Sequence, residues 1–106
     1  MSQATKPTTQ AEVFGLLAQL AGEGAPDPEW TVYADAARIG QVMGRLMLDT
    51  DTEQHKALAV WQRIIGAGPV KVEAGARTDL LSVSGSYEGL AVRIVALVWS
   101  DRGEEL

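Results

Sequence analysis

LAVRIVALVW, residues 90–99, decides the fold of this 106-residue chain. Side chains of a β-strand point alternately to its two faces, and here both alternating sets are apolar. One set is Leu90, Val92, Ile94 and Val98, and the other is Val95, Leu97 and Trp99. A strand that is apolar on both faces belongs in the middle of a sheet or in an interface. We therefore predict a central position for this strand.

A hairpin precedes this strand. Residues 81–87 alternate between two kinds of side chain, an apolar set of Leu81, Val83 and Tyr87 and an outward-facing polar set of Ser82, Ser84 and Ser86. Glu88-Gly89 is a two-residue loop whose glycine suits a turn with positive φ. Further upstream, residues 70–74 alternate between apolar and charged side chains and end at Gly75, which predicts one more strand.

Two amphipathic helices are expected. Thr9 and Glu12 have capping-box spacing, and an apolar stripe runs from Val13 to Leu20 before Gly22 ends the helix. The second helix follows the capping residues 49–52 and ends at the glycines and proline of residues 66–69. Its buried stripe is Leu58, Trp61, Ile64 and Ile65. Between the helices, residues 30–35 alternate as a short strand.

The pattern of residues 38–48 fits either a helix or a strand. As a helix they have an apolar stripe of Ile39, Val42, Met43, Leu46 and Met47, and as a strand Val42, Leu46 and Leu48 share one face. Gly40 and Gly44 would each cost a helix interior about 1 kcal/mol relative to alanine, which favours the strand. A loose echo of residues 37–46 in residues 76–87 favours it further and suggests an αββ unit written twice.

The predicted fold class is α+β, in the order α-β-β-α-β-β-β. We expect one domain over residues 9–100, with a mainly antiparallel sheet and two helices on one of its faces. Residues 1–8 lack periodicity and predict a disordered tail, and residues 101–106 a charged tail.

Two short helices cover only part of a five-stranded sheet. The uncovered face would carry some of Tyr33, Ile39, Met43, Met47, Val95, Leu97 and Trp99, which is more apolar area than a solvated sheet face normally shows. The candidate partner-binding residues are Tyr33, Met43, Met47, Leu97 and Trp99.

Composition excludes several functions. The chain has no cysteine, so it forms no disulfide and offers no thiolate ligand or nucleophile. Its net charge is −5 and its basic residues are scattered singly, which disfavours direct nucleic-acid binding. No stretch has the length of a signal peptide or membrane span, so we expect a cytoplasmic protein without membrane contact. The lack of asparagine among many Ala, Gly and Val residues is typical of a GC-rich bacterial genome.

No catalytic, metal or cofactor site is predicted. Residues 49–53 resemble the start of a calcium loop, but Gln54 stands where the loop needs glycine and Val60 where it needs glutamate. His55 is the sole histidine and belongs to the exposed first turn of a helix. Gly66 and Gly68 lead from a helix into a strand, the reverse of a phosphate-binding loop.

The leading hypothesis is a non-enzymatic protein-interaction module. We expect it to form a homodimer through the uncovered sheet face or the last strand. One alternative is a small-molecule binder with a pocket between sheet and helices, lined by Trp30, Tyr33, Met43 and Trp61. Another is an acidic inhibitor that mimics nucleic acid.

Overall fold

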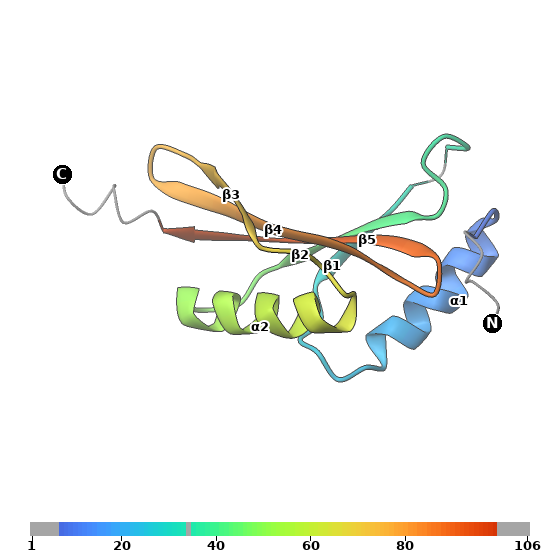
Figure 1. Ribbon diagram of the computed structural model, residues 1–106, viewed down its shortest axis with the longest axis horizontal. Coiled ribbons are helices and arrows are strands. Elements are labelled where there is room, and N and C mark those ends of the chain that lie inside the picture. Colours follow the sequence, from blue (N-terminus) through green and yellow to red (C-terminus); the bar gives the residue numbers. More distant parts are fainter. Residues whose placement is uncertain (1–6, 34, 100–106) are drawn as a thin grey trace.

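The computed structural model describes residues 7–33 and 35–99 (Figure 1). Its elements follow the predicted order and confirm the α+β class. They are α1 (Gln10–Ala21), β1 (Glu29–Val32), β2 (Gln41–Leu46), α2 (Asp51–Ile64), β3 (Lys71–Ala74), β4 (Thr78–Tyr87) and β5 (Leu90–Trp99).

The five strands form one sheet in the order β1-β2-β5-β4-β3. The last strand therefore lies in the middle, as its two apolar faces predict. β5 runs antiparallel to β4 and parallel to β2, and the two outer pairs are antiparallel. Each helix is followed by a hairpin, β1–β2 and then β3–β4, and β5 lies between the two hairpins. The element order thus repeats as αββ, with β5 added.

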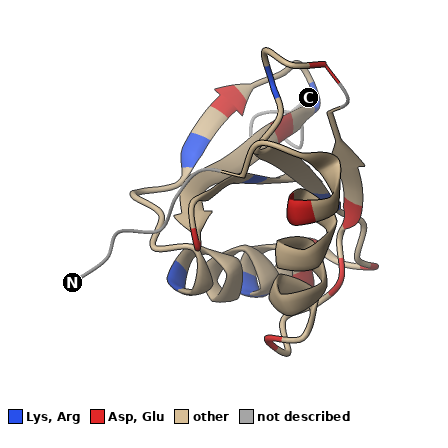
Figure 2. Ribbon diagram, turned by 90° about the vertical axis from the view of Figure 1, so that its right-hand side faces the viewer, with Lys and Arg blue, Asp and Glu red and all other residues tan. Residues whose placement is uncertain are grey.

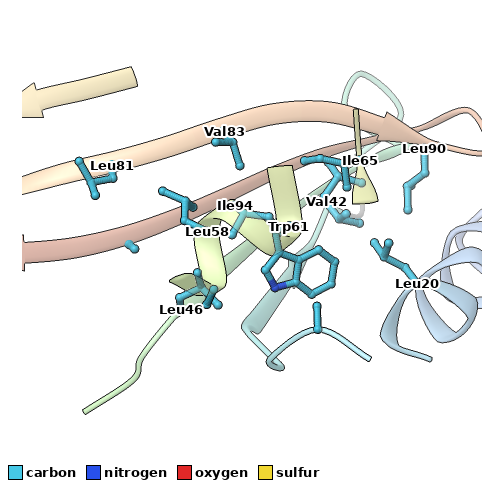
Figure 3. Packing of buried hydrophobic residues seen from close by; sticks show 14 of the residues in the cluster. Leu20, Val42, Leu46, Leu58, Trp61, Ile65, Leu81, Val83, Leu90 and Ile94 are labelled. Atoms are coloured by element: carbon cyan, nitrogen blue, oxygen red, sulfur yellow. The ribbon is translucent and has the colours of Figure 1, made fainter. Parts of the chain in front are cut away.

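Both helices lie on the same face of the sheet (Figure 1). α2 packs along β5, β4 and β2, while α1 adds Val13 and Leu20 to the same hydrophobic cluster. Figure 3 shows the Trp61 indole at the centre of this core, below Val42 and Ile94 of the sheet. Trp61 donates its indole N–H to Pro26 O at 2.9 Å. The core is thus closed by a tryptophan whose one polar atom has a partner.

Both helices begin at a threonine. Thr9 and Thr50 are N-caps with nearly identical extended backbone angles, and their hydroxyls accept the N–H of Glu12 and Glu53. The Glu12 carboxylate accepts in return from the Thr9 hydroxyl, whereas in the predicted capping box it accepts from the N-cap backbone N–H. The hydrogen bond from the Thr9 hydroxyl, with others from Thr8, lowers the pKa of Glu12.

Within residues 38–48, Gln41–Leu46 form the strand β2, as the glycine argument favoured. Val42, Gly44 and Leu46 are buried against the helices. Gly44 has no room for a side chain, because a Cβ there would lie 2.7 Å from Pro28 Cγ and 2.9 Å from Ile94 Cδ1. Gly40, with φ of 90°, makes the turn that leads into the strand.

The hairpin turn before β5 is also as predicted. Tyr87 pairs with Leu90, and Glu88 and Gly89 both have positive φ, at 51° and 86°. The Tyr87 hydroxyl donates to Glu23 at 3.0 Å, which ties this end of the sheet to the loop after α1. Partial burial, with the hydrogen bond to Glu23, raises the pKa of Tyr87.

Some residues lie elsewhere than predicted. Ser82 was expected to face solvent and is buried, because it stands between Val95 of β5 and Lys71 of β3 on the sheet. Ile39 was one of several candidates for the uncovered face and instead packs against the core. Val95 does lie on the uncovered face, but its neighbours there bury it.

The predicted tails fall largely outside the described residues. Residues 1–6 and 100–106 are not among them. Pro7 and Thr8, which belong to the predicted N-terminal tail, are described: Pro7 is fully buried and Thr8 donates two hydrogen bonds to Glu12. Within residues 7–33 and 35–99, no helix is long and apolar enough to cross a membrane.

Candidate functional site: the open face of the sheet

Neither helix covers the opposite face of the sheet in the described residues, and we call this face the open face (Figure 1). Strand alternation and the pairing register decide which side chains reach it. From β5 these are Ala91, Arg93, Val95, Leu97 and Trp99. The neighbouring strands add Gln41, Met43 and Arg45 from β2 and Thr78, Leu80, Ser82, Ser84 and Ser86 from β4. The open face is therefore apolar at one end of β5 and polar at the other.

The apolar end has four side chains, Met47, Leu80, Leu97 and Trp99, which we call the apolar patch. Leu80 is the direct cross-strand neighbour of Leu97, and Met47 follows the last residue of β2 on the other side of β5. Trp99 is 62% exposed, Met47 64% and Leu97 41%. Large apolar side chains gathered in this way on a surface mark a contact site more often than isolated ones do.

The end of β5 is closed along its edge. β2 pairs with β5 only as far as Ala96, so Leu97 to Trp99 have no strand on that side. Gln54 of α2 fills the gap: its amide N–H group donates to Leu46 O and Leu97 O, at 3.1 and 3.3 Å. Asp51 accepts the Trp99 N–H at 2.9 Å. The face of β5, rather than its edge, is thus the surface left for a partner.

The polar end of the open face contains a hollow of about 320 Å³. Its side chains come from Tyr33, Gln41, Met43, Ser84, Ala91 and Arg93, and we call it the Arg93 hollow. Val42 and Val92 also border it, and because their side chains are buried on the helix side, they do so through their backbone. The hollow forms because the side chain of Ala91 is smaller than those of Gln41 and Arg93 beside it.

A fixed cation lies beside the hollow. The guanidinium of Arg38 stacks on the ring of Tyr33, 4.5 Å from its centre. Asp35 holds this guanidinium in an ion pair at 2.8 Å. The hydrogen bond and charge of Arg38 lower the pKa of Asp35. The loop before β2 thereby places a cation against the Tyr33 ring at the rim.

The candidate residues all lie on the open face, but in two groups. Met47, Leu97 and Trp99 belong to the apolar patch, while Tyr33 and Met43 border the Arg93 hollow. The pocket expected between sheet and helices does not bring its four residues together. Trp30 and Trp61 meet edge to face in the core, with ring centres 5.6 Å apart, on the opposite side of the sheet from Tyr33 and Met43.

Sequence reasoning missed two residues of the open face. Leu80 was not assigned to a face, although its register opposite Leu97 places it in the apolar patch. Arg93 was counted among scattered cations. The sequence does distinguish Arg93, because it is the one charged residue in the ten-residue strand LAVRIVALVW.

Charges are distributed without a continuous field of one sign. Figure 2 shows acidic positions on helices, loops and outer strands, whereas a nucleic-acid mimic needs them aligned on one face. Two acidic residues at the start of α2 have structural roles. Glu53 takes part in the cap of the helix, and Asp51 accepts a hydrogen bond from the backbone of β5. In the described part of the chain, no group of three or more His, Asp or Glu residues could hold a metal ion. His55 is exposed, as expected.

Comparison with protein-family models, with curated proteins and with solved structures finds no match to this chain. The function is therefore argued from the residues of the open face.

Proposed function

We propose that the chain is a non-enzymatic protein-interaction module that forms a homodimer through its apolar patch. The observation that carries this proposal is the joint exposure of Met47, Leu97 and Trp99 on a sheet face that no helix covers. Tryptophan anchors near the centre of protein interfaces contribute a large share of binding energy. Trp99 is such an anchor, and Leu80 and Leu97 flank it with apolar surface.

The distribution of charge favours a second copy of the chain as the partner of this patch. The chain has a net charge of −5, so two copies repel each other over much of their surface. None of the four patch side chains is charged. A two-fold dimer uses the same patch on both copies, so the centre of the contact buries uncharged side chains, and Glu73, the cross-strand neighbour of Leu80, lies at its margin.

Sedimentation velocity over a range of protein concentrations tests the proposal. We expect the native chain to change from monomer to dimer as concentration rises, and Trp99→Glu to stay monomeric, since it puts two carboxylates into the symmetric contact. Phe14→Glu is the matched control, because Phe14 is 53% exposed on α1, which packs on the other face of the sheet. A native chain that stays monomeric at millimolar concentration, or a Phe14→Glu chain that loses dimerisation as fully as Trp99→Glu, would overturn the proposal.

A further inference from the structure

We propose that the Arg93 hollow binds a small organic anion, with a carboxylate or phosphate group on Arg93 and an apolar body against Met43 and Tyr33. This site is separate from the apolar patch. It lies at the start of β5, while the patch lies at its end.

Arg93 is a cation without a counter-ion in the described structure. Across the sheet its row reads Thr31, Met43, Arg93 and Ser84, from β1 to β4. No acidic residue stands in that row. In the two neighbouring rows, the acidic side chain is Glu29, which lies two strands away from β5 and directly opposite Arg45.

The other cations near this face each have an acidic neighbour. Arg45 stands opposite Glu29, and Arg38 is paired with Asp35. Lys71 is two residues from Glu73, so both side chains reach the same face of β3. Among the described cations of this face, Arg38 forms an ion pair, whereas Arg45 and Lys71 have an acidic residue nearby without an ion pair. Arg93 differs from all three in having no acidic residue in its row, and its five N–H donors remain available to a ligand.

The surroundings of Arg93 complete a binding site. A volume of about 320 Å³ falls at the lower end of the range of small-molecule pockets. Ser84, the direct cross-strand neighbour of Arg93, and Gln41 add a hydroxyl and an amide to the walls. Met43 and the ring of Tyr33 supply apolar and aromatic surface.

These groups define the chemical class of the ligand. A planar guanidinium matches the two oxygens of a carboxylate or phosphate and binds them with paired, charge-assisted hydrogen bonds. Because the chain is acidic overall, a free anion is attracted only where a cation is locally unopposed. An aromatic acid of the size of benzoate or phenyl phosphate satisfies both the charge and the apolar walls.

NMR titration of the ¹⁵N-labelled chain tests the site. The probes are benzoate, phenyl phosphate, inorganic phosphate and the neutral benzyl alcohol. We expect benzoate or phenyl phosphate to shift the amide signals of Gln41, Ala91 and Arg93. Comparing these two probes distinguishes a carboxylate ligand from a phosphate ligand, and inorganic phosphate, which lacks the apolar body, should bind more weakly than phenyl phosphate.

Two arginine variants separate the site from general charge. Arg93→Gln should weaken binding of the better probe by about tenfold or more, since it removes a charge-assisted pair of hydrogen bonds. Arg45→Gln removes the same charge from the same face and should leave binding nearly unchanged. Equal weakening in both variants, tight binding of benzyl alcohol, or no shift with any probe would overturn the proposal.

The proposals of an anion site and of a dimer can be disproved independently of each other. Arg93→Gln should leave sedimentation unchanged, and Trp99→Glu should leave the titration unchanged, because the two sites lie at opposite ends of β5. The dispersion of each variant's amide spectrum shows whether it is folded.

Discussion

At the scale of single residues, Gln54 replaces a missing piece of β-ladder. It is 5% exposed, and its amide contacts the two strands where they diverge. Its Nε2 donates to Leu46 and Leu97, and its Oε1 accepts the Leu48 N–H at 3.0 Å. One side chain thus satisfies three backbone groups that a continuous pairing of β2 with β5 would otherwise serve.

Replacing Gln54 tests this role. Gln54→Leu replaces the amide with an apolar side chain of similar size and leaves three backbone groups without their partner, so we expect a loss of about 2–3 kcal/mol in the free energy of unfolding. Gln62→Leu is the control on the same helix, where one exposed hydrogen bond to Gly68 is lost, and should cost less than about 1 kcal/mol. Urea denaturation measures both, and equal losses would contradict the role of Gln54.

Sequence alone could not reveal this residue. Gln54 is a polar position in the first turns of an amphipathic helix, and nothing in the pattern shows that two strands separate beside it. Ser82 illustrates the same limit. Alternation places it correctly on the face away from the helices, but its burial depends on side chains of β3 and β5, which are neighbours in space rather than in sequence.

At the scale of elements, glycines set how closely the layers approach. Ile65, just after α2, accepts the Ser86 N–H at 2.9 Å, which joins the end of the helix to β4. A Cβ at Gly85 would overlap this same Ile65 carbonyl oxygen. The close approach of α2 to β4 therefore depends on the absence of a Cβ atom at Gly85.

Alanine at this position should separate the two elements. Gly85→Ala forces the Ile65 carbonyl away from β4, and we expect it to destabilise the fold by about 1–3 kcal/mol. Gly68→Ala is the control, since no atom lies within 4 Å of its added Cβ, and it should change stability by less than about 0.5 kcal/mol. Thermal unfolding followed by circular dichroism compares them. A Gly85→Ala chain as stable as Gly68→Ala would show that the layers can shift without cost.

Element types were largely predictable because they depend on local pattern. Capping at Thr9, the Glu88-Gly89 turn and the two-sided strand at residues 90–99 are all confirmed. Residues 38–48 show where periodicity fails, because helix and strand both gave an apolar face. The glycines resolved it, and the structure supplies the reason: Gly44 lies against Pro28 and Ile94, which would have to shift to admit a Cβ.

At the scale of the whole molecule, the proposed dimer makes stability depend on concentration. If folding and association are linked, Tm should rise over about a hundredfold increase in protein concentration. Trp99→Glu should show the same Tm throughout that range, and Phe14→Glu should behave as the native chain does. Differential scanning calorimetry at several concentrations measures this, and a constant Tm for the native chain would contradict association in the folded state.

The pairing of β2 with β5 was beyond sequence reasoning. Alternation predicts a strand but not its neighbour, and the parallel partners are far apart in the chain, as Gln41 and Ala91 show. The open face was foreseen from an excess of apolar side chains, and its division into an apolar patch and the Arg93 hollow was not. That division follows from the register, which places small Ala91 beside Gln41 and large Leu97 beside Leu80.

The central position of β5 also governs how the chain acquires its structure during translation. The ribosome delivers the β1–β2 and β3–β4 hairpins first, and β2 and β4 each lack a neighbour until residues 90–99 emerge. At about 5–20 residues per second, the edge of β2 stays unpaired for seconds, whereas that of β4, which is joined to β5 by the Glu88-Gly89 turn, is paired soon after it is made. Closure then requires pairing between distant segments, which is slow in comparison with local hairpin formation. The interval before β5 arrives is therefore when the edge of β2 is open to pairing with another chain.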